Sequence, residues 1–303
     1  MPRAGDTQRL RTVAPAKVNW TLEVLGRRAD GYHEIRSVMQ TISLADTLVG
    51  VRARAFALTI DGPELVGLNV EENLVTKAAR SFRDTGNSDE ASMFLTKQIP
   101  AAAGLGGGSS DAAATLRLIP RLATRAIDAD VERIAADAGS DVPFFLRGGL
   151  QRASGRGEVL QVLPSPPPQM LVVLTPPIRL TNKSARLYAA LQAKHFGAGD
   201  ATEGLVTKVC SGGRPDEEDY VNVFDRVADL VYPELGRFRT ALESLTGSRA
   251  MLAGAGPSLF AVARRPTDHL PAGGPTDPAI VDGAKAWVVR TLDAREATRV
   301  DVE

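Results

Sequence analysis

The 303-residue sequence lacks the features that mark several common classes of protein. It has one cysteine, Cys210, which excludes an intramolecular disulfide and makes a cysteine-based metal cluster unexpected. Its three histidines form no HExxH pattern, so no metal site is predicted. The formal net charge is zero, which does not indicate a nucleic-acid-binding protein but leaves a small anionic substrate open.

Long apolar runs are absent too. None reaches the roughly 20 residues of a membrane span, and residues 1–11 have no apolar segment of a secretory signal. We therefore expect a cytoplasmic protein that binds neither nucleic acid nor a membrane. The composition, 44% apolar and 24% charged, is that of an ordinary globular protein, and the length allows two domains.

Glycine is abundant and is concentrated in one run. Residues 99–114 read Ile-Pro-Ala-Ala-Ala-Gly-Leu-Gly-Gly-Gly-Ser-Ser-Asp-Ala-Ala-Ala. Glycines allow close approach of a ligand and positive φ, and the alanines favour a helix whose first N–H groups suit a phosphate. The run has no Gly-Lys-Ser/Thr ending, and Ser109 replaces the last glycine of GxGxxG. A phosphate loop and a flexible turn capped by Ser110 or Asp111 are therefore equally supported by composition alone.

The remaining chain predicts an α+β fold, because strands and helices do not alternate as regular βαβ units. Strands are predicted over residues 11–25, around 37–42 and 48–60, over 91–97, as a pair ending near 163, over 171–174, and as a terminal strand over 286–292. Residues 251–262 are predicted to be a second glycine turn that leads into a strand. Helices are predicted over 73–84, from the glycine run to Ile119 before Pro120, over 130–138, and near 184–194, 221–231 and 232–244. Residues 196–219 are predicted to be a loop, and residues 267–277 carry few structural signals. Pro164–Pro168 marks a boundary between residues 1–165 and 166–303.

Two charged residues in apolar surroundings are candidates for catalysis. Lys17 lies in a strand-like segment, where an edge-strand lysine in solvent is favoured by about two to one. Asp141 precedes a Val-Pro-Phe-Phe run, where a helix cap is favoured by about the same margin. If the two meet, the aspartate can accept a proton from a hydroxyl while the lysine keeps it ionised and balances charge on a transferring phosphoryl group.

Tyr32 and His33 follow the Asp30-Gly31 turn. Such a pair suits a planar ring, which it can hold by stacking and hydrogen bonding. Two surface residues after a turn are an adequate alternative.

Taken together, these segments resemble the GHMP kinase superfamily, in ordered blocks across roughly the whole chain. The blocks are Pro15–Asn19 with Gly26–Glu34, Lys97–Ala114, Gly139–Phe145 with Gly155–Glu158, and Leu252–Phe260. The first two segments are the most specific, and they are similar to the branch of the superfamily whose substrate carries cytidine diphosphate.

The resemblance implies a two-domain α+β fold, with an N-terminal domain like domain 2 of ribosomal protein S5 and a C-terminal ferredoxin-like α/β sandwich. It implies a kinase that transfers the γ-phosphoryl group of ATP to a hydroxyl of a small molecule in the cleft between the domains. Mg²⁺ would arrive with the nucleotide, and the protein would be a monomer or homodimer. Asp141 is the implied general base and Lys17 its electrostatic partner.

The resemblance also implies the binding residues. Asn19, Tyr32 and His33 would hold the cytidine diphosphate part of the substrate. The implied ATP-binding residues are those of the glycine run and two further positions: Pro100, Ala101, Ala102, Ala103, Gly104, Leu105, Gly106, Gly107, Gly108, Ser109, Ser110 and Asp111, with Asn73 and Lys97.

The chain departs from the family pattern at three places, of which Pro120 with the irregular region 264–283 concerns the boundary helices and the C-terminal strands. Ala253 and Ala255 stand where serine or threonine is usual, so a hydroxyl contact there is lost. Arg186 stands where an aromatic residue usually stacks on cytosine, and Tyr188 follows two places on. Arginine also stacks on rings, so both residues are predicted to bind substrate.

Three alternatives remain. A homoserine- or mevalonate-type kinase has no cytosine to hold, which the Gly31–Glu34 block disfavours. A dinucleotide-binding oxidoreductase expects its glycine loop near the N-terminus and is supported at less than about one in twenty. A non-catalytic nucleotide-binding regulator would not need both Lys17 and Asp141.

Overall fold

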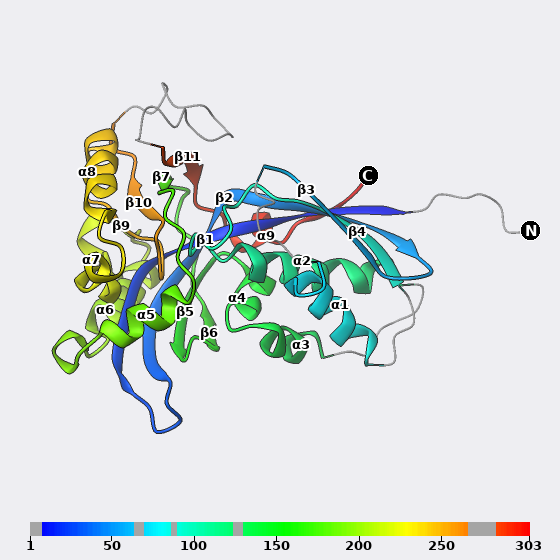
Figure 1. The fold of residues 1–303 in the computed structure, drawn as a ribbon, viewed down its shortest axis with the longest axis horizontal. Helices are drawn as coiled ribbons and strands as arrows, with labels where there is room; N and C mark the ends of the chain where they lie inside the picture. The colour runs from blue at the N-terminus through cyan, green and yellow to red at the C-terminus, as the bar shows by residue number, and fades with distance from the viewer. Residues whose placement is uncertain (1–7, 64–69, 86–89, 124–129, 266–282) are drawn as a thin grey trace, which may run out of the picture.

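The computed structural model describes residues 8–63, 70–85, 90–123, 130–265 and 283–303. Two long antiparallel strands, β1 (Arg9–Arg27) and β2 (His33–Ala53), form the spine of an eight-stranded sheet (Figure 1). The other strands of this sheet are β3 (Ala57–Asp61), β4 (Glu90–Thr96), β5 (Leu150–Gly155), β6 (Val159–Val162), β8 (Val221–Asn222) and β12 (Val300–Val302).

The prediction of separate strands around 37–42 and over 48–60 places the break between strands at the wrong position. β2 is continuous, and β3 is a separate short strand. The ladder between β1 and β2 shifts register between Pro15 and Ala16. Asp46 in β2 is fully buried and accepts hydrogen bonds from the backbone N–H groups of Gln98 and Ile99.

Four helices cover one face of this sheet (Figure 1). They are α1 (Leu74–Arg83), α2 (Gly107–Leu122), α3 (Val131–Ala138) and α4 (Val142–Arg147). The helices predicted over 73–84 and 130–138 are confirmed as α1 and α3, which the side chains of Asn73 and Asp130 cap. The predicted end of α2 at Ile119 is wrong, because the helix continues through Pro120 to Leu122. Proline removes one backbone bond in the last turn, and the burial of Leu118, Ile119 and Leu122 offsets that loss.

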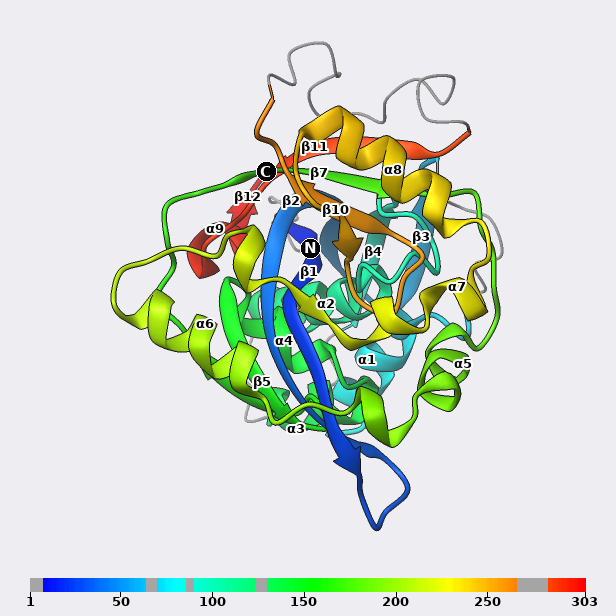
Figure 2. The same ribbon diagram turned by 90° about the vertical axis from the view of Figure 1, so that its left-hand side faces the viewer.

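A second, four-stranded antiparallel sheet has the order β11 (Lys285–Arg290), β7 (Met170–Thr175), β10 (Leu259–Val262), β9 (Met251–Leu252). Figure 2 shows α8 (Leu235–Thr246) packed against it. Among the described residues, the other helices are α5 (Lys183–Ala190), α6 (Asp200–Cys210), α7 (Ala228–Val231) and α9 (Ala294–Ala297), with 3-10 turns at Ala193–His195, Glu217–Asp219 and Val223–Arg226. α9 contacts α4, β1 and β2.

Several predictions for this half need correction. The predicted loop 196–219 contains α6, whose buried residues Thr202, Leu205 and Val209 lie three or four positions apart on one helix face. The predicted helix 221–231 is instead β8, a 3-10 turn and α7. The strand predicted over 286–292 is β11, but it is not terminal, since β12 follows and pairs with β1. The segment 267–277 lies outside the described residues.

Apolar residues of the two sheets pack against each other. Trp20 of β1 lies 5.4 Å from the ring of Tyr220 and 5.5 Å from that of Phe260 in β10. The mixture of sheets and helices confirms the α+β fold. The division at 165/166 stays a prediction, and β8 and β12 from the second half pair with β1 of the first.

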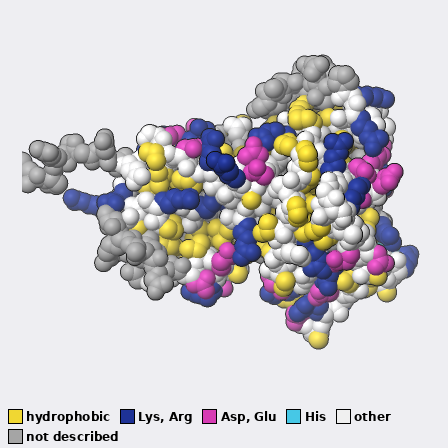
Figure 3. All heavy atoms as spheres, turned by 180° about the vertical axis from the view of Figure 1, so that it is seen from behind, with side chains coloured by type: hydrophobic (Ala, Val, Ile, Leu, Met, Phe, Trp, Pro, Cys, Tyr) yellow, Lys and Arg dark blue, Asp and Glu magenta, His cyan; other side chains and the backbone are white. Residues whose placement is uncertain are grey.

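Positive and negative side chains are interspersed over the face in Figure 3, in keeping with a zero net charge. In the described part of the chain, no helix is both long and apolar enough to cross a membrane.

Candidate active site

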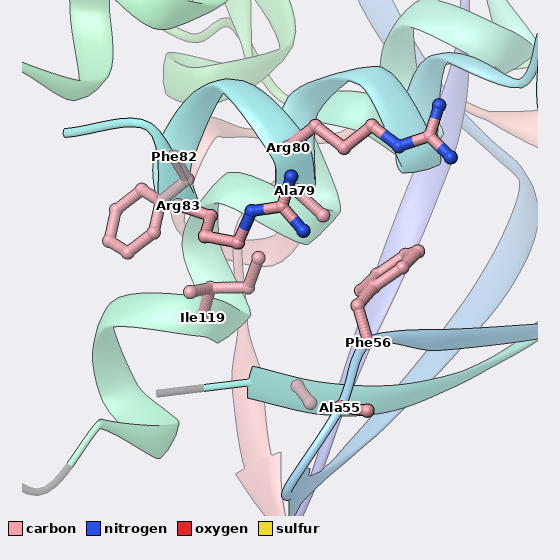
Figure 4. A pocket seen from close by; sticks show the side chains of 8 residues that line it. Ala55, Phe56, Ala79, Arg80, Phe82, Arg83 and Ile119 are labelled. Carbon is pink, nitrogen blue, oxygen red and sulfur yellow. The ribbon is translucent and has the colours of Figure 1, made fainter. Parts of the chain in front are cut away.

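A large cleft of about 1320 Å³ collects most of the residues predicted for catalysis and substrate binding. Lys17, Asn19, Ser109 and Asp141 line one region of it, and Tyr32, His33 and Tyr188 another. A smaller pocket of about 260 Å³ lies between α1, α2 and the start of β4 (Figure 4). It is lined by none of the predicted site residues.

Lys17 is buried in the middle of β1, with 6% of its surface exposed. Its backbone N–H donates to the carbonyl of Leu105 at 3.0 Å. Leu105 belongs to the glycine loop, the part of the glycine run that precedes α2, and this loop covers the edge of β1 that faces away from β2. The interpretation of Lys17 as an edge-strand lysine in solvent is therefore wrong. Its Nζ donates to Asn19 Oδ1 at 2.5 Å, and Asn19 Nδ2 donates to Ser37 Oγ at 2.7 Å. Burial lowers the pKa of Lys17, and the carboxylate of Asp141 opposes that effect.

Asp141 occupies the N-cap position of α4, as predicted, yet its side chain makes no capping hydrogen bond. The buried Phe144 and Phe145 hold α4 against the core and carry Asp141 to the cleft wall. Its carboxylate acts electrostatically on Lys17. A half-buried carboxylate that does not cap its helix and faces a lysine across a cleft is available to accept a proton.

The glycine loop leads directly into α2. Gly104 and Gly106 have left-handed backbone, with φ of 86° and 78°, whereas Gly107 is already helical. Gly106 is the N-cap, and no side chain caps the helix, so the interpretation with Ser110 or Asp111 as cap is wrong. Both of those residues are buried inside the helix, and Ser109 lines the cleft. The uncapped N–H groups of a 16-residue helix therefore begin beside the cleft.

A buried ion-pair network anchors this loop, and one member was missed by the sequence analysis. Lys97 Nζ pairs with Asp46 and, at 2.6 Å, with Asp111 Oδ2. Although burial lowers the pKa of Lys97, the carboxylates of Asp111 and Asp46 raise it overall. Burial raises the pKa of Asp111. The sequence feature that could have predicted this ion pair is Asp46 itself, because a carboxylate within a largely apolar strand needs a partner.

We expect Lys97→Met to destabilise the protein by about 3–5 kcal/mol, because it leaves two buried carboxylates without their cation. Urea denaturation followed by circular dichroism measures this loss. Lys77→Met, on the exposed side of α1, is the control and should change stability by less than about 0.5 kcal/mol. A Lys97→Met protein as stable as the control would show that the network contributes nothing.

Asn73 also has a structural role, as the cap of α1, where its Oδ1 accepts from the N–H of Val75 at 2.9 Å. The structure thus explains Asn73, Lys97 and Asp111 by packing and pairing. Their part in nucleotide binding, like that of Pro100–Ser110, stays a prediction.

The other region of the cleft is aromatic. The ring of His33 stacks on Tyr188 with centroids 4.6 Å apart and an interplanar angle of 17°, and Tyr188 meets Phe224 edge-on. Tyr32 is 55% exposed, and the guanidinium of Arg156 lies 4.7 Å from its ring centroid. Burial, with a smaller contribution from the Arg27 charge, lowers the pKa of His33.

Tyr188 lines the cleft, whereas Arg186 is exposed and does not line it. The structure therefore pairs His33 with the second of the two residues predicted for this segment. Phe196, Phe224 and Arg156 also line the cleft and were not predicted as site residues. Only the Gly155–Glu158 block, already noted in the sequence, pointed to Arg156.

The second glycine loop, residues 253–257, closes the cleft near Lys17. The Asn19 N–H donates to the Ala253 carbonyl at 3.0 Å, and a Cβ on Gly254 would lie 2.8 Å from Lys17 Nζ. Tyr232 Oη donates to the Ala255 carbonyl at 2.9 Å. Backbone contacts thus hold this loop in place without the hydroxyls that Ala253 and Ala255 lack.

The fold and the site define a kinase of the GHMP class. Residues 73–149, from the cap of α1 to the residue before β5, match the family described as GHMP kinases N terminal domain. The fold is shared with a homoserine kinase from Cytophaga hutchinsonii, at a TM-score of 0.67 and 15% identity over 100% of this chain and 99% of that one.

Relatives with higher sequence identity to this chain belong to one particular group of GHMP kinases. The chain is 37% identical to a 4-diphosphocytidyl-2-C-methyl-D-erythritol kinase from Dehalococcoides mccartyi strain 195, over 83% of this chain and 88% of that protein. It is 34% identical to the kinase of the same name from Heliobacterium modesticaldum, over 97% and 99% of the two chains. A crystal structure of 4-(cytidine 5'-diphospho)-2C-methyl-D-erythritol kinase matches with a TM-score of 0.75 and 33% identity, over 93% and 98%. The chain belongs to the 4-diphosphocytidyl-2-C-methyl-D-erythritol kinase family.

Proposed function

We propose that the protein transfers the γ-phosphoryl group of ATP to the 2-hydroxyl of 4-diphosphocytidyl-2-C-methyl-D-erythritol, a step of the non-mevalonate route to isoprenoid precursors. One observation carries this proposal. A single cleft is lined by Lys17 and Asp141, lies beside the uncapped start of α2, and includes the stacked pair His33–Tyr188. We assign the phosphates to the start of α2, the reacting hydroxyl to Lys17 and Asp141, and the cytosine to the aromatic pair.

In the proposed reaction Asp141 accepts the proton of the substrate hydroxyl as its oxygen forms a bond to the γ-phosphorus. The bond from that phosphorus to the bridging oxygen breaks, and ADP leaves with the electron pair. The ammonium of Lys17 compensates charge on the transferring group, and the N–H groups at the start of α2 hold the phosphates. Asn19 accepts a hydrogen bond from Lys17 Nζ and so sets the direction of the ammonium.

Magnesium is proposed to enter with the nucleotide, where it neutralises phosphate charge. Among the residues that the structure describes, no group of three or more His, Cys, Asp or Glu side chains is placed to hold a metal ion. The phosphates and water are therefore proposed as its main ligands, with oxygens of Ser109 and Asp141 nearby in the cleft. We also propose a cytoplasmic monomer or homodimer, with the domain boundary at Pro164–Pro168.

A coupled ADP-release assay tests the function. With ATP and Mg²⁺, turnover is expected with the cytidylylated methylerythritol and not with homoserine or mevalonate. Comparable turnover of homoserine or mevalonate would place the chain with another GHMP kinase. If no ADP is released with any of the three substrates, a non-catalytic nucleotide-binding protein is favoured.

We expect His33→Ala and Tyr188→Ala to raise the dissociation constant of the cytidylylated substrate while leaving that of ATP unchanged. Loss of a stacking partner costs about 1–3 kcal/mol per ring. Calorimetric titration of each ligand separates the two affinities.

Arg186→Ala on the same helix is the matched comparison, and because Arg186 does not line the cleft its effect should be smaller than that of Tyr188→Ala. Unchanged substrate affinity in both variants would mean that α5 does not reach the cytosine.

A further inference from the structure

Lys183 is a half-buried lysine that the reaction described above does not use. It is the first residue of α5, and its Nζ donates to the carbonyls of Ala102 at 2.5 Å and Gly256 at 2.8 Å. A positive charge is unfavourable at the start of a helix. Two charge-assisted hydrogen bonds offset that cost, and they join the glycine loop to the second glycine loop.

Both carbonyls belong to residues in left-handed backbone. Ala102 has a φ of 56° and Gly256 a φ of 59°, and for alanine this conformation is strained. The loops are also in close contact, because a Cβ on Gly104 would lie 2.7 Å from the Gly256 oxygen. Lys183 therefore stabilises a loop conformation and a loop-to-loop contact that the backbone alone does not favour.

The surroundings of Lys183 are positively charged. Burial, together with the ammonium of Lys17, lowers the pKa of Lys183 to about 8. The start of α2 adds the positive end of its dipole. Positive charges held this close repel one another, and a bound polyanion such as a triphosphate relieves that repulsion.

We propose that Lys183 is a positioning residue for phosphoryl transfer. Its ammonium ties the glycine loop to the second glycine loop. It thereby holds the start of α2, Gly254 and Lys17 at the spacing that the ATP phosphates require. This inference rests on the proposed function. Lys183 acts through the two loops, since its own bonds go to their carbonyls.

Lys183→Met tests this role. Without the two bonds we expect the KM for ATP to rise about tenfold or more, the loss typical of a charged hydrogen bond, and kcat to fall. The KM for the cytidylylated substrate, measured at saturating ATP, should stay within about twofold, because the His33–Tyr188 pair is not disturbed. Lys183→Arg should recover much of the ATP affinity, since a guanidinium can donate to both carbonyls.

Lys194→Met is the control, an exposed lysine in the 3-10 turn after α5, and its kinetics should match those of the unaltered protein.

The KM for ATP measured as a function of pH separates the effect of the Lys183 charge from that of its packing. Three kinds of group surround Lys183. The two loops present carbonyls to it, and β1 presents the Lys17 ammonium. Tyr232 lies beside Gly256, and burial raises the pKa of Tyr232 to about 12. As pH rises through about 8, Lys183 loses its proton, so the KM for ATP should rise in the unaltered protein. In Lys183→Arg that rise should be smaller, because arginine stays charged.

The outcomes are distinguishable. A Lys183→Met protein with both KM values within about twofold of the unaltered protein overturns the inference, as does an equal rise in the KM of both substrates. A loss that Lys183→Arg does not recover, with no difference in pH profile, would also reject it. Failure of the proposed function appears separately, as absence of turnover in the unaltered protein or full activity of Asp141→Asn.

Discussion

Asp141→Asn is expected to reduce kcat by about 10²–10⁴-fold, the range typical for loss of a general base. Asparagine keeps the size and hydrogen-bonding shape of the side chain but cannot accept the proton of the substrate hydroxyl. The helix should be unaffected, because the Asp141 side chain makes no capping bond that the change could remove. Nucleotide binding should stay nearly intact, since the phosphates are assigned to the glycine loop.

The measurement is a coupled ADP-release assay at saturating ATP and substrate, with ATP affinity determined by calorimetry. Asp137→Asn is the control, because Asp137 lies on α3 and pairs with the exposed Arg133 at 3.2 Å. Loss of such a surface pair costs about 0–1 kcal/mol in stability and should leave turnover unchanged. Turnover of Asp141→Asn within a few fold of the unaltered protein would remove Asp141 from the mechanism.

Gly106→Ala is expected to weaken ATP binding by roughly tenfold or more while affecting the cytidylylated substrate less. The φ of Gly106 is 78°, and a Cβ there would lie 2.6 Å from Phe145 Cζ and 3.3 Å from Lys17 Cγ. The left-handed backbone alone costs alanine about 1–2 kcal/mol. To relieve the contact, either the first turn of α2 or the ring of Phe145 must move, and both lie against the site.

Gly204→Ala is the control outside the site. Gly204 lies within α6, and a Cβ there would meet nothing within 4 Å. Alanine should raise helix stability there by about 0.5–1 kcal/mol. Separate titrations with ATP and substrate give the comparison. Equal losses for the two ligands, or a loss for substrate alone, would contradict the assignment of the glycine loop to phosphate.

The glycine loop and the helix that follows it were predictable because they depend on local chemistry. Left-handed backbone at Gly104 and Gly106 and a helix beginning at Gly107 follow from residue types that are neighbours in the chain. The caps of α1 and α3 were predictable for the same reason. α6 was missed because its polar and glycine-rich sequence hides a narrow apolar face, which only packing against β1 and β2 makes decisive.

What the sequence by itself determined was the set of chemical parts: a helix start free for phosphate, an aspartate before an apolar helix, a lysine in a strand, and a Tyr-His pair after a turn. Only the tertiary structure decided how these parts act. Lys17 is buried because Leu105 and Ala253, far along the chain, bond to the open edge of β1. Tyr188 rather than Arg186 meets His33 because of the direction in which α5 packs. Burial and partners are set by contacts between distant segments, and these contacts decide whether a lysine is solvated or catalytic and whether a carboxylate caps a helix or accepts a proton.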